Sequence, residues 1–369
     1  MGWDGSGLLI VGDQVQTFGG QERVLESLLQ RYPAADAVAL RFRRRPRNEG
    51  RSPRGAERVR GLRTPGSRHS LLMPLYAGRM ALAPSSRADV VLSLTQGGSS
   101  VGARTRRGTP HVTYSSGPPT IYGQSEIVLK DERPVLRPAV RAALPALRAC
   151  HARLMRRPDR LIANSNYSAG HLKHEYGLAA EVLHPPVRVD FFTPAPRERR
   201  HWLAVGRVTS QKRFDLLLAA FAQLDAELVV AGTGPALSRL RADAPPNVSF
   251  VGFAHDDSLR ELYRSARGVI TPSLETFGLV MAEALACGIP VIAQRAGGAL
   301  ELVREGVTGA FLESVAPSAV IHAMEALERM RPDPEACRAS VEPYSEERFL
   351  ARMDSVLDAE RAGVRGRCP

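Results

Sequence analysis

Two glutamates separated by seven residues lie in the stretch Thr271–Gly298, TPSLETFGLVMAEALACGIPVIAQRAGG. After Gly278 the pattern predicts a helix, and eight residues of helical rise would span about 12 Å. Glu275 could then address a sugar while Glu283 accepts hydrogen bonds from a ribose. Two unrelated glutamates on an exposed helix would show the same spacing. Because Glu283 lies in a mostly apolar run, however, we expect it to be buried and bonded to a partner.

The start of this predicted helix also suits an anion. The first N–H groups of a helix have no partner within it, and the helix dipole favours negative charge there. Phe277, Gly278 and Leu279 would supply these N–H groups. A diphosphate between a sugar and a ribose would lie against them.

A second group of residues follows a predicted strand at Ala204–Arg213, AVGRVTSQKR. The strand ends at Gly206, and Arg207 and Lys212 follow in the loop. Two cations beside the carboxyl end of a strand can compensate the charge of a departing diphosphate. Two solvated loop cations are the alternative interpretation.

Gly19 and Gly20 follow the loop after the first predicted strand. Glycines allow the backbone to approach a ligand closely, and the helix that follows favours anions. The chain contains no G-x-G-x-x-G after this strand, which argues against an ordinary NAD-binding domain. It also contains no D-x-D, so we expect neither a carboxylate-held metal ion nor any cofactor.

The net charge of +12 favours anionic partners. Eleven arginines against two acids stand between Arg41 and Arg68, as a solvated loop or as an anion-binding patch. Aromatic residues are not interleaved with these arginines, as they often are in nucleic-acid-binding segments, so we do not expect nucleic-acid binding. No leader or membrane span is evident, which predicts a cytoplasmic protein. Peripheral contact of the basic first domain with the inner membrane face stays open, through a helix face that carries Arg137, Arg141 and Arg148.

Short apolar segments alternate with helical stretches along the chain, which indicates parallel sheets of βαβ units. The Pro-rich segment His184–Pro196 interrupts the alternation and predicts a linker between two such domains. Two doubly wound sheets would face each other across a cleft at the carboxyl ends of their strands. The predicted strands are Leu8–Val11, Val90–Leu94, His111–Tyr114 and Leu161–Ala163, then Trp202–Val205, Leu228–Ala231, Val248–Val251, Gly268–Thr271 and Val291–Ala293.

Several motifs together resemble the GT-B retaining glycosyltransferases of family 4, and the loops look most similar to the mannosyltransferase branch. The resemblance implies two Rossmann-like domains, at 1–187 and 188–342, with a cleft between them. It also implies a final segment, 343–369, whose helix crosses back to the first domain before a disordered tail. The motifs are GGQERV, IANSNYSAGHLKHEYG, LHPPVRVDFF, VGRVTSQKRFDLLLAAF, VVAGTGP and the pair of glutamates with its surroundings.

The resemblance implies a role for each of these positions without a metal ion. Arg207 and Lys212 would hold the donor diphosphate, Glu275 the donor sugar and Glu283 the ribose. The backbone of Phe277, Gly278 and Leu279 would contact sugar and phosphate, and Gly19 and Gly20 would approach the diphosphate. Relatives often carry a histidine, on the acceptor side of the reacting centre, where this chain has Ser116. The resemblance therefore implies that Ser116, with His111 and Asn164, lies on the acceptor side.

The resemblance therefore predicts transfer of a hexosyl unit from a GDP- or UDP-sugar to an unidentified acceptor, such as a glycan, a lipid-linked sugar or a small metabolite. The configuration would be retained by a front-face mechanism. Other enzymes of the same fold, an epimerase or a phosphorylase, stay open as alternatives. A nucleotide-sugar-binding subunit without catalysis is a further alternative, motivated by the missing histidine.

Overall fold

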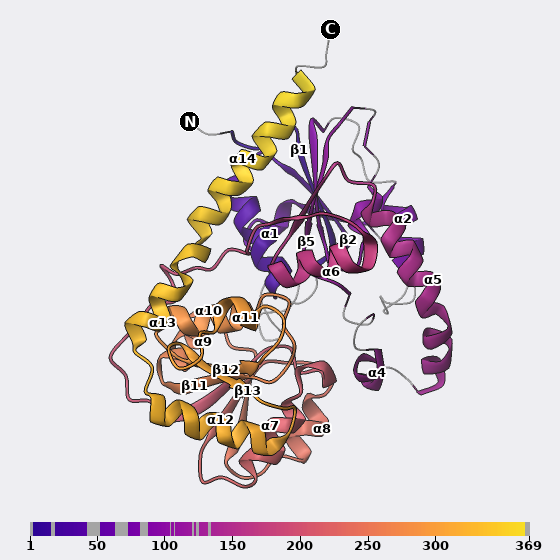
Figure 1. The fold of residues 1–369 in the computed structure, drawn as a ribbon. Helices are drawn as coiled ribbons and strands as arrows, with labels where there is room; N and C mark the ends of the chain where they lie inside the picture. The colour runs from indigo at the N-terminus through magenta and orange to yellow at the C-terminus, as the bar shows by residue number, and fades with distance from the viewer. Residues whose placement is uncertain are drawn as a thin grey trace.

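The computed structural model describes residues 3–15, 19–42, 52–62, 73–81, 88–103, 105–106, 108–119, 122, 125–131 and 134–365. These residues form two α/β domains, one above the other in Figure 1, each built on a parallel sheet. The predicted fold class, two Rossmann-like domains, is confirmed. The predictions for most of the basic stretch 41–68 and for the tail after 365 fall outside the described residues.

The first domain contains a seven-stranded sheet in the order β3-β2-β1-β4-β5-β6-β7. Strand β1 pairs in parallel with β2 and with the central strand β4. Strands covered by helices on both faces read as continuous apolar runs, as β1 and β4 do. The strands are β1 Leu8–Val15, β2 Asp36–Phe42, β3 Val59–Gly61, β4 Val90–Thr95, β5 His111–Ser115, β6 Arg160–Ala163 and β7 Glu181–Val182.

Helices connect these strands and cover both faces of the sheet (Figure 1). They include a long helix, α5, which continues through Pro145. The α-helices are α1 Gly20–Arg31, α2 Met73–Met80, α4 Ser125–Val128, α5 Arg137–Met155 and α6 Asn166–Tyr176, and the short 3-10 helices are η2 Ala56–Arg58, η3 Ser100–Gly102, η4 Leu129–Asp131 and η5 Pro134–Leu136.

The second domain contains a six-stranded parallel sheet in the order β10-β9-β8-β11-β12-β13. Its order reverses beside β8, so the loops after β8 and β11 diverge and leave room between them. The strands are β8 His201–Val205, β9 Leu228–Ala231, β10 Val248–Gly252, β11 Ala266–Thr271, β12 Val291–Gln294 and β13 Gly309–Leu312.

The helices of the second domain are short apart from α12 and pack on both faces of this sheet (Figure 1). They are α7 Phe214–Phe221, α8 Leu237–Ala242, α9 Asp256–Arg264, α10 Leu279–Ala286, α11 Ala299–Leu302, α12 Pro317–Met330 and α13 Pro334–Val341, with the 3-10 helices η6 Ser210–Lys212 and η7 Glu342–Tyr344.

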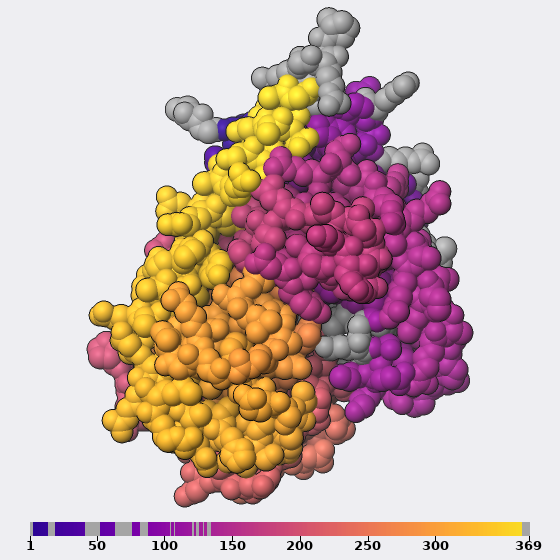
Figure 2. Space-filling model, in the orientation of Figure 1, coloured from indigo at the N-terminus to yellow at the C-terminus, as the bar shows by residue number. Residues whose placement is uncertain are grey.

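The last helix, α14 (Glu346–Arg365), runs from the second domain back along the first, as Figure 2 shows in yellow. Its apolar side chains complete the core beside α1 and β4, with Phe349 and Met353 fully buried. The two chain crossings lie side by side, because Val187 donates its N–H to the Tyr344 carbonyl at 2.9 Å. The linker and the start of α14 thus form a two-stranded hinge.

All three arginines on the expected membrane-facing side of α5 have partners within the protein, and Arg137 donates to the carbonyl of Lys130 at 3.2 Å. Arg141 pairs with Glu126 at 2.6 Å, and Arg148 donates to the carbonyl of Tyr122. None of the helices in the described residues is both long and apolar enough to cross a bilayer.

Candidate functional site

Lys212 and Glu275 meet at the carboxyl ends of β8 and β11. Their Nζ and Oε1 atoms lie 2.5 Å apart, and the hydroxyl of Ser273 donates to the same oxygen at 2.7 Å. Both side chains stay partly exposed, at 24% and 19%. The structure thus brings together Lys212, predicted to hold the donor diphosphate, and Glu275, predicted to hold the donor sugar, at a place that a ligand can reach.

Arg207, the third of these residues, lies on the same loop with its side chain exposed. Within the part of the chain that the structure describes, no ion pair holds its guanidinium. An exposed cation next to a tethered one can bind an anion without first breaking a contact. The loop therefore offers one free and one paired cation.

Glycines hold this loop against the turn that follows β9. A Cβ atom on Gly232 would lie 1.8 Å from the carbonyl oxygen of Gly206, and one on Gly234 would lie 2.2 Å from that of Val208. Gly232 also has φ of 149°, which side chains rarely adopt. From the sequence, this Gly-rich segment, Ala231–Pro235, could border the base of a nucleotide or be only a turn. Its actual role is to support the backbone that carries Arg207 and Lys212.

A second pair of glycines supports the loop that carries Glu275. The N–H of Gly298 donates to the Glu275 carbonyl at 2.8 Å, and a Cβ on Gly298 would lie 2.2 Å from the Phe277 carbonyl oxygen. A Cβ on Gly297 would lie 2.2 Å from the Glu275 carbonyl oxygen. These glycines were not among the predicted site residues, although their position shortly after β12 could have indicated a close approach. We call the loops 206–212, 232–235 and 273–278 the second rim.

The helix after Glu275 begins later than its spacing suggested. Only Leu279–Ala286 is helical, and Gly278 at its N-cap has φ of 101°. Glu275 thus lies in a loop, so the expected 12 Å of continuous helical rise between the two glutamates is wrong. Among the described residues, no hydrogen bond is donated by the N–H groups of Phe277, Gly278 or Leu279. These groups remain able to bind an anion.

Gly19 and Gly20 lie at the start of α1, at the boundary between the domains. Gly20 comes so close to the second domain that a Cβ there would lie 3.3 Å from Leu279 Cδ1. The structure therefore brings Gly20 close to the N-terminus of α10.

Glu283 is buried beneath this boundary, with its side chain 4% exposed. Its Oε1 lies 2.9 Å from Nε of Arg23, which α1 contributes from the other domain. The hydroxyl of Tyr263 donates to its Oε2 at 3.0 Å. The expectation of a buried, bonded carboxylate holds. Its partner Arg23 was missed, because nothing in the sequence indicates a contact between residues so far apart.

Two further charges complete this buried group. Asp256 lies 3.5 Å from Nη2 of Arg23 and 2.9 Å from Nη2 of Arg188. Burial raises the pKa of the Glu283 carboxyl, and the guanidiniums of Arg23 and Arg188 oppose that rise. Burial also lowers the pKa of Arg188, and the neighbouring Arg23 adds to this effect.

Ser116 and Asn164 face the second domain at the carboxyl ends of β5 and β6. The hydroxyl of Thr276, next to Glu275, donates to the Ser116 carbonyl at 2.9 Å, and Asn164 Nδ2 lies 3.2 Å from that hydroxyl. A Cβ on Gly117 would lie 2.4 Å from Thr276 Cγ2. The structure thus places two of the three predicted acceptor-side residues beside Glu275.

His111 is not placed there, and this expectation is corrected. It occupies the first position of β5, at the opposite end of the strand from Ser116. Its Nε2 lies 2.6 Å from the hydroxyl of Ser93, and burial lowers its pKa to about 4. A neutral ring inside the domain supports the fold and cannot reach a ligand in the cleft.

Asp13 organises the loop after β4, another feature that the sequence analysis missed. Its Oδ2 accepts hydrogen bonds from the Thr95 hydroxyl at 2.8 Å and from the N–H groups of Gln96 and Gly97, and its Oδ1 accepts from Ser100 N–H at 2.6 Å. One buried carboxylate therefore fixes the whole turn. We call the loops 96–100 and 116–117 the first rim.

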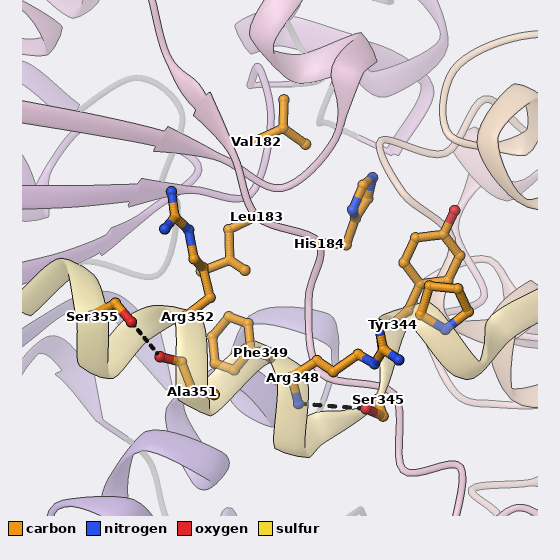
Figure 3. Close-up of a pocket in the computed structure, with 11 residues that line it drawn as sticks. Val182, Leu183, His184, Tyr344, Ser345, Arg348, Phe349, Ala351, Arg352 and Ser355 are labelled. Carbon is orange, nitrogen blue, oxygen red and sulfur yellow. Dashed lines mark hydrogen bonds between the residues drawn. The ribbon is translucent and has the colours of Figure 1, made fainter.

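Two grooves are lined by residues that the structure describes, and the second of them includes Ser210 and Pro235 of the second rim. The first, of about 440 Å³, lies on the outer side of the hinge, between residues 182–184 and the start of α14 (Figure 3). The second, of about 400 Å³, lies between η4 and η6 and includes Lys130, Arg213 and Arg239. Neither groove is lined by a predicted site residue.

The chain matches two family models and several proteins. Residues 18–191 match Glycosyltransferase Family 4, and residues 189–360 match Glycosyl transferases group 1. D-inositol 3-phosphate glycosyltransferase 1 of Catenulispora acidiphila is 33% identical over 220 residues, 50% of this chain and 53% of that protein. D-inositol 3-phosphate glycosyltransferase of Mycobacterium sp. (strain KMS) is 37% identical over 199 residues, 46% of this chain and 45% of that protein.

The chain thus spans about half the length of the curated relatives it matches. Among solved structures, Anabaena HepE in complex with UDP and glucose superposes with a TM-score of 0.71 at 18% identity, over 95% of this chain and 99% of that one. This likeness shows the GT-B fold. Because the two family models together account for residues 18–360, the chain belongs to the family 4 glycosyltransferases.

Proposed function

We propose that this protein transfers a hexosyl unit from a nucleoside diphosphate sugar to an acceptor hydroxyl, with retention of configuration and without a metal ion. The observation that carries the proposal is the Lys212–Glu275 pair at 2.5 Å, beside the N–H groups of Phe277, Gly278 and Leu279, which donate no hydrogen bond within the described residues. A cation and free N–H groups suit the diphosphate, and the carboxylate suits the sugar hydroxyls.

In this proposal Arg207 and Lys212 bind the diphosphate, and Lys212 moves from Glu275 to a phosphate oxygen. Glu275 is then released to accept hydrogen bonds from the sugar. Glu283 binds the ribose, and the backbone at Gly19 and Gly20 closes over the diphosphate. Since HepE was crystallised with UDP and glucose, UDP-sugars are the first donors to test, followed by GDP-sugars.

The reaction would take place on one face of the sugar. The bond between the anomeric carbon and the diphosphate oxygen breaks, and the acceptor oxygen bonds to the same face of that carbon. The acceptor proton passes to the departing diphosphate, so no enzyme base is needed. Positive charge from Arg207 and Lys212 stabilises the leaving group as its negative charge develops.

The acceptor would approach from the first rim, past Ser116 and Asn164. The two curated relatives are named for D-inositol 3-phosphate, so phosphorylated polyols are the first acceptors to test. A lipid-linked sugar or a glycan end would enter along the same rim.

The first test is thermal unfolding with UDP, GDP, dTDP or ADP in the presence of EDTA. Binding at a hundred times Kd should stabilise the protein by about 2.7 kcal/mol. A preference for one diphosphate would support a metal-independent donor site, whereas no shift with any of them would refute it.

The second test measures turnover of the preferred donor by Lys212→Ala. Removing a charge that stabilises the leaving group should lower kcat about 10²- to 10³-fold. Lys173→Ala, at an exposed position of α6, is the matched control and should keep full activity. Binding of nucleotide without turnover of any hexose donor would instead favour the non-catalytic subunit.

A further inference from the structure

Of the buried charge group formed by Glu283, Asp256, Arg188 and Arg23, Arg23 is the residue that α1 of the first domain contributes. It lies one turn into α1, which begins with the glycine pair and reaches the boundary with the second domain (Figure 1). Its partners Glu283 and Asp256 lie on α10 and α9 of the second domain. The Arg23–Glu283 contact can therefore exist only when the two domains are closed on each other.

The guanidinium of Arg23 is held in one orientation. Its Nε bonds to Glu283 at 2.9 Å, while its Nη2 lies 3.5 Å from Asp256. The ring of Phe192 packs at 5.7 Å from the guanidinium carbon. A planar fork held at both ends fixes its partners as well as itself, which a flexible ammonium group would not do.

Glu283 in turn is held at both oxygens, by Arg23 at Oε1 and by Tyr263 at Oε2. An ionised carboxylate has about four acceptor positions, so about two remain for the hydroxyls of a ribose. Tyr263 belongs to the same domain as Glu283 and holds it in any domain arrangement. Arg23 supplies the part of this support that depends on closure.

We propose that Arg23 is a positioning residue of the donor site, which fixes the Glu283 carboxylate for the ribose hydroxyls when the domains close. This inference rests on the proposed function, in which Glu283 binds the ribose. It assigns to the arginine of the GGQER segment a role in donor recognition without contact to the donor. Discrimination of the ribose would then depend on the first domain, although the nucleotide binds to the second.

The test compares two ligands on each variant. The Kd values of UDP and of 2′,3′-dideoxyuridine diphosphate are measured by calorimetry, and their ratio gives the contribution of the ribose hydroxyls. Hydrogen bonds to a carboxylate should make this ratio about 10- to 100-fold in the native protein. The ratio should fall to about 1–3 in Arg23→Met and in Glu283→Gln. Arg23→Lys, which keeps the charge but not the fork, should give an intermediate ratio.

Arg31→Met is the matched control, because Arg31 lies on the same helix and pairs with Asp354 at 2.8 Å on α14, away from the second domain. It should keep the native ratio. If Arg23→Met binds both ligands more weakly but keeps the ratio, Arg23 serves domain stability only and the inference is overturned. Should Arg23→Met fail to fold, a native ratio in Arg23→Lys would overturn the inference in the same way.

The two assignments fail in different ways. Loss of the ratio in Glu283→Gln with its retention in Arg23→Met removes only the positioning role. An unchanged ratio in Glu283→Gln removes the ribose role of Glu283 and the inference with it. Absence of binding by the native protein to both UDP and GDP overturns the proposed donor site itself.

Discussion

The two rims of the cleft are held in shape by different means. In the first rim a side chain holds the loop, since the Asp13 carboxylate accepts one hydrogen bond from the end of β4 and three from the loop after it. In the second rim, glycines hold the loops by allowing close backbone contacts. Gly232 lies within this rim, and Gly298 packs against it. Removing the Asp13 side chain would delete hydrogen bonds without a steric clash, so the backbone of the first rim could keep its conformation. In the second rim, a single added methyl group at a glycine would overlap with neighbouring backbone atoms.

The largest effect should come from Gly232→Ala in the second rim. The new Cβ would meet a backbone oxygen at 1.8 Å, and the residue would keep an unfavourable φ. Overpacking and backbone strain together should lower the free energy of unfolding by about 5 kcal/mol, measured by urea denaturation. Gly170→Ala in α6, where a Cβ meets nothing within 4 Å, should instead stabilise by up to about 1 kcal/mol. Equal effects of the two substitutions would contradict the role of close approach.

Asp13→Ala tests the first rim. Deletion of the carboxylate leaves the buried Ser100 N–H and the Thr95 hydroxyl without a partner, so the free energy of unfolding should fall by about 3–4 kcal/mol. Hydrogen exchange should show the faster amides confined to residues 96–100. Asp159→Ala is the control, because that carboxylate accepts from His111 N–H at the other end of the sheet. In Asp159→Ala, the hydrogen-exchange rates of the amides in the first rim should stay unchanged.

Acid should weaken the first domain through two histidines. Burial holds the pKa of both His111 and His151 at about 4, against 6.5 for a free ring. Their stabilising effect is complete above pH 6.5 and is lost as the pH falls from 6.5 toward 4, because the unfolded chain binds protons first. Protonation of each histidine should lower the free energy of unfolding by up to about 3 kcal/mol, which is measured as a fall in Tm.

The exposed His174 serves as a control, and His174→Gln should leave this pH profile unchanged. A Tm that stays level between pH 6.5 and 4.5 would show that the buried rings do not govern acid stability.

The smallest effect should come from the contact between the rims. Thr276→Val keeps the shape of the side chain but removes the hydroxyl that donates to the Ser116 carbonyl. We expect the free energy of unfolding to fall by about 1 kcal/mol. The KM for the donor should rise up to about fivefold, with kcat nearly unchanged. A fall in kcat as large as that of Lys212→Ala would mean that this hydroxyl takes part in the reaction itself.

The strands that the sequence predicted correctly are those with apolar or β-branched runs. Leu228–Ala231 was predicted with its true ends, and β1, β4, β5 and β12 within a few residues. Strand β2, in the sequence DAVALRF, was missed because alanine has low strand propensity and the first domain must supply the neighbours that stabilise it. Strand β13, in the sequence GAFL, was missed because glycine and alanine at its start have low strand propensity.

The candidate site follows the same division. Glycines and charged residues of the second rim lie close together in the sequence, so motifs such as AVGRVTSQKR showed them at once. Asp13 and Arg23 act on partners 82 and 260 positions away, Thr95 and Glu283. Only the folded chain brings such side chains together. His111 was placed wrongly for another reason, because it stands at the start of the predicted strand His111–Tyr114, whereas the cleft lies at the carboxyl ends of the strands. Local spacing predicts local backbone geometry, while side-chain partnerships depend on tertiary structure.

The helix α14 has a consequence for the order in which the molecule is made. Phe349, Met353, Val356 and Leu357 belong to the core of the first domain, although the ribosome adds them after the whole of the second. Domains generally fold as units, starting from the N-terminus during synthesis. Here the second domain can complete its fold before the first domain has received its last helix, α14. The domain that is begun first is therefore completed last, and until then its apolar groove stays uncovered on the ribosome.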